Sequence, residues 1–507
     1  MVKVHGRVTA SPLQYGGGGG DYFWAAAEAA PDKTFIAYQG RELTFAQVNH
    51  LTAKTSAWLQ SHCQSQPGDK VGILMPNCLP YVWTVLALMR LRVIIVPLNT
   101  RLTADELQWQ LEKAQCKLVI CAPETLAKAK SCTTKFLLFP PESQLHPPAA
   151  IDRFARPALA EDFAIIHTSG TSGRPKATVL SYGNIYHSAL ASAQRLGALP
   201  DDRWLCVLPL CHVGGLSIIL RSLIYGTAVE LLPAFDVDAV NRLLSEQPIS
   251  LVSLVPTMLQ RLLAAKQRGW NPRLRLILLG GEAARLSLVE RCLAEQIPVA
   301  ASYGLSESSS QVATALSQQL REKSGTVGKP LPGTQARIVD EQGRTLAANT
   351  AGEVLVKGAT VMRGYYDDVA ATNRALRAGW LRTGDIGYLD ADGDLFIMQR
   401  RSDLIISGGE NIYPAEVEAA LRQHPALDDA LVFGLPDEQW GQRVAALVQL
   451  KPGEIVAVNE LIDFAGQRLA RYKIPREYAF AKLPRSAAGK VNRSAARKTF
   501  HAAIARR

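Results

Sequence analysis

The sequence predicts an α/β protein with a large layered domain that carries a small β-rich subdomain, followed by a small α+β domain. Three observations predict this fold class. The chain has 507 residues, too many for one ordinary hydrophobic core. Short apolar segments alternate with helix-like segments through most of the chain. The pattern then changes twice, near Thr326 and near Arg400, so we expect domains at 1–399 and 400–507.

The large domain is expected to begin its alternation near Phe35. Strands are predicted where short apolar runs stand between turn residues, and helices where an apolar pattern runs for longer. The predicted strands are 71–75, 94–96, 117–121, 162–167, 203–209, 251–255, 274–279 and 299–303. The predicted helices are 82–89, 104–114 and 183–195. Glycine-rich 16–20 and proline-rich 140–148 predict loops.

The β-rich subdomain and the small domain follow. Short strands between Gly and Asp turns are predicted at 336–339, 352–357, 387–389 and 395–398. Beyond Arg400 we expect a helix at 414–422, strands at 430–434 and 444–450, and a helix at 458–468. About a hundred residues is a usual size for such a domain.

Composition narrows the class of protein. A hydrophobic content of 48% and a charged content of 20% are typical of a globular chain. The longest apolar runs, 81–97 and 213–232, contain Arg90, Arg92 and Arg221, so they predict buried elements rather than membrane spans. No secretory signal is recognised and the eight cysteines form no CxxC, so we expect a cytoplasmic protein with reduced thiols and no cysteine metal site.

The formal charge of +11 is unevenly distributed, because Glu477 is the only acid beyond residue 466. Such a basic bias favours polyanionic partners. Nucleic acid is one candidate, and a nucleotide together with a second phosphorylated cofactor is another. A solvated basic face is the third interpretation.

The segment HTSGTSGRPK, residues 167–176, has the residue types of a phosphate-binding loop. Gly170 and Gly173 allow tight turns, so that successive N–H groups can point at an anion. Lys176 adds a positive charge. The hydroxyls of the loop belong to Thr168, Ser169, Thr171 and Ser172. The spacing is not that of a Walker A loop, and a polar surface turn is the alternative.

Three further segments carry polar groups suited to a nucleotide. In Ser302-Tyr-Gly-Leu-Ser-Glu307, an aromatic ring can stack on a base and a carboxylate can hold Mg²⁺. In Trp380-Leu-Arg-Thr-Gly-Asp385, an Asp in a turn after Gly offers two acceptor oxygens to ribose hydroxyls. Lys490 lies in a Gly-containing turn after RRSDLIISGGENIYP, which begins at Arg400.

In this order and spacing, the motifs resemble the adenylate-forming enzymes, which include acyl-CoA ligases, luciferases and peptide-synthetase adenylation domains. The resemblance runs from about Asp32 to Arg493. It implies ATP, Mg²⁺ and coenzyme A as small-molecule partners. It also implies that the loop 168–176 binds phosphate and that Lys490 bridges the carboxylate and the α-phosphate. The other implied ATP residues are Gly281 and Glu282 beside adenine, Ser302, Tyr303 and Gly304 around the base, Ser306 at phosphate, Glu307 at Mg²⁺, and Asp385 and Arg400 at the ribose.

The same resemblance implies a second half-reaction, in which a thiol attacks the acyl-AMP. The C-terminal domain would be mobile and would pivot at Ser402 and Asp403. The segment Ser407, Gly408, Gly409 and Glu410 would then face the thiol channel, and the basic tail suits coenzyme A phosphates.

Residues 208–225 carry the information on which carboxylic acid is the substrate. His212 would be the gate of the acyl pocket in this family, although a buried structural histidine is the alternative. Arg221 is a lone cation in an apolar stretch, and a buried guanidinium needs a partner. That partner is either a structural acid or a second carboxylate on the substrate. The runs HVGGLSIILRSLIYG and SYGLSESSSQVATAL resemble o-succinylbenzoate–CoA ligases of menaquinone or phylloquinone synthesis. This resemblance implies that Arg221 meets the benzoate carboxylate and that Ser309 and Ser310 offer hydroxyls on the same wall of the pocket.

Several alternatives remain at the level of sequence. A fatty-acid or aryl-acid CoA ligase, or a stand-alone adenylation domain, would carry the same nucleotide motifs. A nucleotide-binding protein without chemistry would not need Lys490. We expect no specific nucleic-acid binding and no membrane span, and the sequence leaves the oligomeric state open, a homodimer included.

Overall fold

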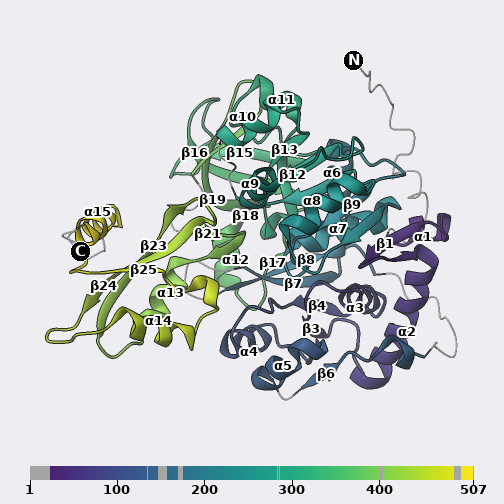
Figure 1. The fold of residues 1–507 in the computed structure, drawn as a ribbon, viewed down its shortest axis with the longest axis horizontal. Coiled ribbons are helices and arrows are strands. Elements are labelled where there is room, and N and C mark those ends of the chain that lie inside the picture. Colours follow the sequence, from purple (N-terminus) through teal and green to yellow (C-terminus); the bar gives the residue numbers. More distant parts are fainter. Residues whose placement is uncertain are drawn as a thin grey trace. The chain divides into compact units, whose positions relative to one another are not determined.

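The computed structural model describes residues 23–133, 135–146, 157–168, 175–282, 284, 286–399, 404–484 and 493–505 (Figure 1). The chain divides into two compact units. The first contains Met1–Thr100, Leu111–Ile166 and Ala177–Gln399. The second contains Arg101–Gln110, His167–Lys176 and Arg400–Arg507.

A seven-stranded sheet forms one layer of the first unit. Its order is β17-β8-β7-β4-β3-β5-β6, and β3, β4, β5, β6 and β7 pair in parallel. The strands β3, β4, β5 and β7 are short and mostly buried, as expected where helices cover a parallel sheet, whereas the edge strand β6 is partly exposed. The strands are β3 (Lys70–Leu74), β4 (Ile94–Pro97), β5 (Leu118–Cys121), β6 (Phe136–Leu138), β7 (Asp162–Thr168), β8 (Lys176–Ser181) and β17 (Gly364–Tyr365).

An eight-stranded sheet forms a second layer, in the order β14-β13-β12-β11-β9-β10-β1-β2. Its interior pairs are parallel, and the outermost strand at each edge is antiparallel to its neighbour. The strands are β1 (Thr34–Tyr38), β2 (Arg41–Thr44), β9 (Arg203–Cys206), β10 (Ala228–Leu231), β11 (Leu251–Leu254), β12 (Leu276–Leu279), β13 (Val299–Leu305) and β14 (Ser310–Ala315).

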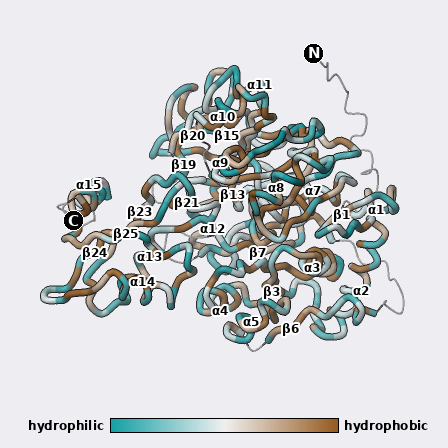
Figure 2. The backbone as a smooth tube through the Cα atoms, in the orientation of Figure 1, coloured by the Kyte–Doolittle hydropathy of each residue, from teal (hydrophilic) through white to brown (hydrophobic). Residues whose placement is uncertain are grey.

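One hydrophobic core joins both sheets to the helices that pack on them. It includes residues of α2 (Phe45–Cys63), α3 (Leu79–Arg90), α6 (Tyr182–Leu196) and α7 (Val213–Tyr225). Figure 2 shows hydrophobic residues concentrated around β7 and α7. A second cluster lies under α8 (Val237–Glu246), α9 (Pro256–Ala265), α10 (Leu286–Ala294) and α11 (Ser317–Glu322).

The β-rich subdomain is an antiparallel sheet in the order β15-β16-β19-β18, with β20 beside β19. Its strands are β15 (Thr334–Val339), β16 (Gly352–Gly358), β18 (Leu376–Arg377), β19 (Trp380–Leu389) and β20 (Leu395–Gln399). The prediction that Asp385 lies in a turn is wrong. Asp385 lies inside β19, because the strand continues past Gly384. The backbone there has φ of 75°, and the pairing with β16 is irregular but does not end.

The C-terminal sheet of the second unit is covered on both faces. Its strands are β21 (Ile405–Ser407), β22 (Glu410–Ile412), β23 (Leu427–Asp437), β24 (Gly441–Leu450) and β25 (Glu477–Phe480). Alternate residues of β23 and β24 face opposite sides. Val432 and Ala446 pack with α13 (Pro414–Leu421) and α14 (Val458–Gly466), whereas Phe433 and Leu447 pack with α15 (Arg493–Ile504).

Most predicted elements are found with shifted ends. The predicted strand 203–209 ends at Cys206, because residues 207–212 lead into the helix α7 instead. Among the helices that were not predicted are α2, α7, α8, α9, α10, α11 and α15. All eight cysteines are free, and among the described residues no helix has the length and apolarity of a membrane span. The predicted loop 16–20 lies outside the described residues.

Candidate functional site

The β13–β14 hairpin gathers several predicted site residues at one end of the eight-stranded sheet. Tyr303 and Gly304 lie in β13, Ser306 and Glu307 in the short helix η4 (Ser306–Ser308), and Ser310 opens β14. The backbone crosses itself closely here, since a Cβ on Gly304 would lie 1.8 Å from the Ser310 carbonyl oxygen. The site at this position therefore requires glycine.

Asp385 is held by an aromatic residue of the hairpin. The Tyr303 hydroxyl donates a hydrogen bond of 2.7 Å to Oδ2 of Asp385, and both side chains are buried. The Asp385 N–H also donates to Thr383 Oγ1 at 3.1 Å. This hydrogen bond fixes the ring of Tyr303 relative to the carboxylate of Asp385, although the two residues are 82 apart in sequence.

Glu307 is oriented by Tyr365. The Tyr365 hydroxyl donates to Oε1 of Glu307 at 3.0 Å, and the Met362 N–H donates to the Glu307 carbonyl at 2.8 Å. Tyr365 lies in β17, which pairs with β8 through Gly364↔Val179 and Tyr365↔Thr178. Mg²⁺ is commonly bound through one or two carboxylates plus phosphates, and an outer hydrogen bond often orients such a carboxylate. The residues present therefore fit a magnesium ion.

The segment after β12 lies against Ser302. The Ser302 hydroxyl donates to the Leu279 carbonyl at 2.9 Å, and a Cβ on Gly280 would meet that same hydroxyl at 2.9 Å. Gly281 has φ of +79°, a region that favours glycine. Gly281 and Glu282 follow the carboxyl end of a parallel strand, where ligands of open α/β sheets commonly bind.

The predicted phosphate loop is described only at its ends. Thr168 ends β7, Lys176 opens β8, and the Thr168 hydroxyl donates to the Lys176 carbonyl at 3.4 Å. The predicted site residues that lie outside the described part of the chain are Ser169, Gly170, Thr171, Ser172, Gly173, Arg400, Ser402, Asp403 and Lys490.

The predicted thiol-channel segment forms a tight hairpin in the second unit. Ser407 ends β21, Glu410 opens β22, and Gly408 and Gly409 between them have φ of 59° and 84°. Two positive φ values at the centre of a two-residue turn match the right-handed twist of the strands. A Cβ on Gly408 would lie 2.8 Å from the Trp440 ring, so the turn also needs a small residue.

The predicted acyl-pocket residues lie at the start and in the middle of α7. His212 is the N-cap residue, and its carbonyl accepts hydrogen bonds from the N–H groups of Gly215 and Leu216. Arg221 lies two turns further on and is 2% exposed. Its Nη2 donates to the Ser188 hydroxyl at 3.3 Å, and its Cζ lies 6.0 Å from the centre of the Trp204 ring.

The charge of Arg221 has no anionic partner in the described part of the chain. Within the described ranges no ion pair involves this guanidinium, and its Nε is buried without a hydrogen-bond acceptor. Burial lowers the pKa of Arg221, and the neighbouring Tyr225 acts in the opposite direction. Burial also raises the pKa of Tyr225 to about 12, so the hydroxyl is neutral near pH 7 and cannot balance the charge. A structural acid was one of the two partners considered for Arg221, and none of the described residues provides it.

Ser309 and Ser310 adopt backbone conformations that L-residues seldom take, with φ of 54° and 99°. The Ser309 hydroxyl donates to the Thr360 carbonyl at 2.8 Å, and its own carbonyl accepts from Ser188 at 2.7 Å. The prediction concerned the hydroxyls of these serines. In the structure, the backbone carbonyl of Ser309 also accepts a hydrogen bond.

Ser188 and Tyr365 contact predicted site residues but were not themselves predicted from the sequence. Neither carries a recognisable signal, because a single serine inside a helix and a tyrosine after a glycine are both common. The described residues contain no cluster of three or more His, Cys, Asp or Glu side chains arranged for a metal ion. Any metal here would therefore depend on phosphate oxygens as well as on Glu307.

The fold and this arrangement define a class of protein. Residues 23–366 match the family of AMP-binding enzymes, and residues 416–490 match the AMP-binding enzyme C-terminal domain. The chain belongs to the AMP-binding enzyme family.

Individual proteins that are similar to this chain have names more specific than that of the family. The 2-succinylbenzoate–CoA ligase of Bacillus mycoides is 38% identical over 92% of this chain and 96% of its own length. The corresponding ligase of Bacillus velezensis is 40% identical over 92% and 95%. Among solved structures, a double mutant of o-succinylbenzoate CoA synthetase from Bacillus subtilis, bound to its product analogue, is 36% identical. It has a TM-score of 0.89, with 94% of this chain and 98% of that chain covered. The amide bond synthetase McbA of Marinactinospora thermotolerans is 26% identical with a TM-score of 0.87, over 95% and 100%.

Proposed function

We propose that this chain is an ATP-dependent acid–thiol ligase that activates o-succinylbenzoate and transfers it to coenzyme A, a step of menaquinone or phylloquinone synthesis. One observation carries the choice of acid. Arg221 is a buried cation without an anionic partner in the described part of the chain. An unpaired buried charge is costly, so a substrate with a second carboxylate would remove a penalty that a fatty acid would leave in place.

The first half-reaction joins the acid to AMP. A carboxylate oxygen of the substrate attacks the α-phosphorus of ATP, and pyrophosphate leaves. Asp385, oriented by Tyr303, is suited to accept hydrogen bonds from ribose hydroxyls, and Arg400 would donate hydrogen bonds to the ribose oxygens. The loop 168–176 and Ser306 would donate to phosphate oxygens, and Gly281, Glu282 and Ser302 would line the adenine pocket. Glu307 would hold Mg²⁺, which when bound neutralises phosphate charge.

The second half-reaction joins the acyl group to the thiol. The sulfur of coenzyme A attacks the acyl carbon of the adenylate, and AMP leaves. Lys490 would neutralise the developing charge only in the first step. We infer that a C-terminal domain of residues 400–507 pivots at Ser402 and Asp403, so that Lys490 gives way to the hairpin Ser407–Glu410. A cytoplasmic enzyme is consistent with these soluble substrates.

The test compares acids on wild-type enzyme. We expect coenzyme A ester formation to be fastest with o-succinylbenzoate, ahead of octanoate and 4-coumarate. The most informative comparison is 3-benzoylpropionate, which is o-succinylbenzoate without its ring carboxylate. Faster turnover of octanoate or 4-coumarate would contradict the proposed substrate and leave another acyl-CoA ligase activity in its place.

Two substitutions of Arg221 test its role directly. Arg221→Ala removes the cation, and Arg221→Met removes the charge but keeps most of the volume, so that the helix can stay packed. Each is expected to lower kcat/KM for o-succinylbenzoate by on the order of 100-fold, about 3 kcal/mol, because a desolvated charge pair is lost. The value for 3-benzoylpropionate should stay the same or rise. An unchanged KM for o-succinylbenzoate would exclude Arg221 as the carboxylate partner.

A further inference from the structure

A chain of two hydrogen bonds connects Arg221 to the turn that follows Glu307. Arg221 Nη2 donates to the Ser188 hydroxyl at 3.3 Å, and the Ser188 hydroxyl donates to the Ser309 carbonyl at 2.7 Å. A hydroxyl has one hydrogen, so once it is donated to Ser309 only lone pairs face the guanidinium. The direction of both hydrogen bonds is therefore fixed.

Ser188 does not behave like an ordinary helical serine. Hydroxyls inside helices commonly donate to the carbonyl four residues earlier. In this chain Thr55, Ser56 and Thr84 do so, at 2.8, 2.9 and 2.8 Å. Ser188 lies inside α6 and is 3% exposed, yet its hydroxyl leaves its own helix and reaches the turn before β14. The usual hydrogen bond of a helical hydroxyl to its own helix therefore does not explain this contact.

The turn that it reaches is strained. Ser309 and Ser310 have φ of 54° and 99°, and such conformations are unfavourable for residues other than glycine, so they persist only where the surroundings fix them. The Ser188 hydroxyl holds the Ser309 carbonyl, and Thr360 accepts the Ser309 hydroxyl at 2.8 Å. A cation on the far side polarises the Ser188 hydroxyl and strengthens its bond to the turn.

We propose that Ser188 is a positioning residue that orients the guanidinium of Arg221 for the second carboxylate of the substrate. This inference rests on the proposed function. The bond to Ser188 is the one hydrogen bond recorded for this guanidinium within the described ranges, and Trp204 contacts it only through the ring face. Recognition of a planar carboxylate depends on the angle of the guanidinium as well as on its charge. Without Ser188 the cation keeps its charge but loses the contact that sets this angle.

The experiment measures kcat/KM for o-succinylbenzoate divided by kcat/KM for 3-benzoylpropionate. This ratio does not depend on the fraction of enzyme that is folded. We expect Ser188→Ala to lower it about 10-fold through KM for o-succinylbenzoate, with KM for ATP unchanged. Ser188→Thr keeps the hydroxyl and should retain most of the ratio. Ser192→Ala is the matched control, because Ser192 lies one turn along α6, is 1% exposed and faces the Tyr225 hydroxyl, whereas the hydrogen bonds to the Arg221 guanidinium and to the Ser309 carbonyl belong to Ser188.

A double substitution separates positioning from packing. On the Arg221→Met background, Ser188→Ala should leave the ratio unchanged, because nothing remains to be oriented. A wild-type ratio in Ser188→Ala, or an equal fall in Ser192→Ala, would overturn the role of Ser188. If wild-type enzyme does not prefer o-succinylbenzoate over 3-benzoylpropionate, the proposed function itself fails, which is a different outcome.

Discussion

Gly304 illustrates how a single position can set the geometry of the site. It separates Tyr303, which holds Asp385, from the turn that carries Glu307 and Ser309. The β13–β14 register shifts between Tyr303 and Gly304, and the two strands approach closely there. In the sequence this glycine is one of 38, and only the structure identifies the steric reason for it.

Replacing this glycine tests the close approach. In Gly304→Ala the new methyl group would lie 1.8 Å from a backbone oxygen, so the hairpin must move. We expect a loss of about 1–3 kcal/mol of unfolding free energy, as in overpacked cores, and a lower rate of adenylate formation. Thermal unfolding and pyrophosphate release are the measurements. Gly269→Ala is the control, because a Cβ there meets nothing within 4 Å, and a similar loss in that variant would contradict the steric explanation.

Arg221 shows what sequence could and could not decide at this scale. Its position in an apolar stretch already predicted that it needs a partner. Whether that partner is a protein acid depended on which side chains the fold brings near it. Trp204, Ser188 and Tyr225 come from β9, α6 and α7, and none of them is anionic near neutral pH.

At the scale of elements, strands are recognised more easily than their ends. β19 was predicted as 387–389 and extends over Trp380–Leu389, because pairing with β16 and β20 continues past the glycines at 384 and 387. Pairing is a property of neighbouring strands, which a single segment of sequence does not contain. β23 was likewise predicted as 430–434 and extends over Leu427–Asp437.

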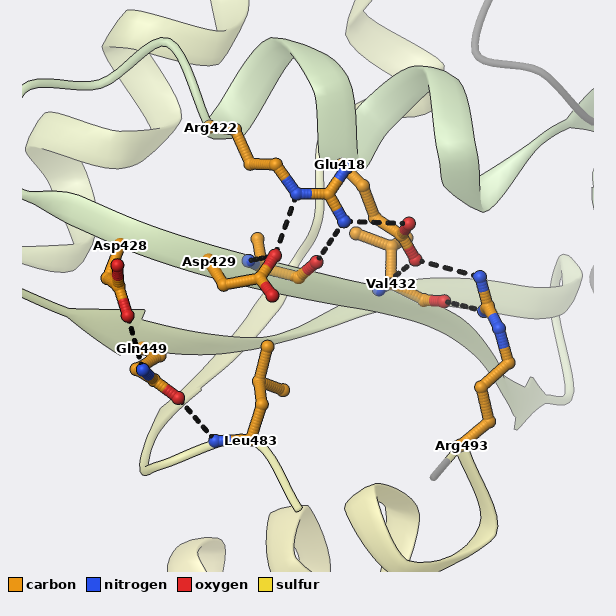
Figure 3. A network of polar contacts seen from close by, with 9 residues as sticks. Glu418, Arg422, Asp428, Asp429, Val432, Gln449, Leu483 and Arg493 are labelled. Atoms are coloured by element: carbon orange, nitrogen blue, oxygen red, sulfur yellow. Dashed lines mark hydrogen bonds and ion pairs between the residues drawn. The ribbon is translucent and has the colours of Figure 1, made fainter. Parts of the chain in front are cut away.

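Glu418 joins three elements of the second unit (Figure 3). Its Oε1 accepts from the Val432 N–H at 3.0 Å and from Arg493 Nη2 at 3.2 Å, and its Oε2 accepts from Arg422 at 3.2 Å. The carboxylate is buried, whereas both arginines are partly exposed. The contact with the strand N–H is therefore expected to contribute more than either ion pair.

Replacing Glu418 is expected to destabilise the sheet around β23. Glu418→Ala leaves the buried Val432 N–H without its side-chain acceptor, at a cost of about 1–3 kcal/mol. We expect faster hydrogen exchange in peptides that cover β23, measured by mass spectrometry on the full chain, and a smaller effect for Glu418→Gln. The control is Glu454→Ala at an exposed position. Equal exchange in Glu418→Ala and wild type would show that the network does not stabilise this sheet.

At the scale of the whole molecule, the proposed chemistry separates into two half-reactions served by different parts of the second unit. Lys490 would act in adenylate formation, and the Ser407–Glu410 hairpin in thioester formation. A lysine required for one step only should separate the two steps in a kinetic assay.

We expect Lys490→Ala to slow pyrophosphate release by on the order of 10²–10³, as for the loss of one charge-stabilising donor. Conversion of pre-formed acyl-adenylate to the coenzyme A ester should remain close to the wild-type rate. Lys482→Ala, at an exposed lysine of the same basic tail, is the matched control. Equal slowing of both half-reactions would contradict a role confined to adenylation.

The sequence by itself determined the layered α/β class, the family resemblance and the lone cation at Arg221, because periodicity, motif spacing and charge are local properties of the chain. Tertiary structure decided which groups meet. It joined Tyr303 to Asp385 and Tyr365 to Glu307, and it placed Ser188 between Arg221 and the Ser309 turn. These contacts join segments between 33 and 121 residues apart, and such pairings arise from packing, which no local pattern encodes.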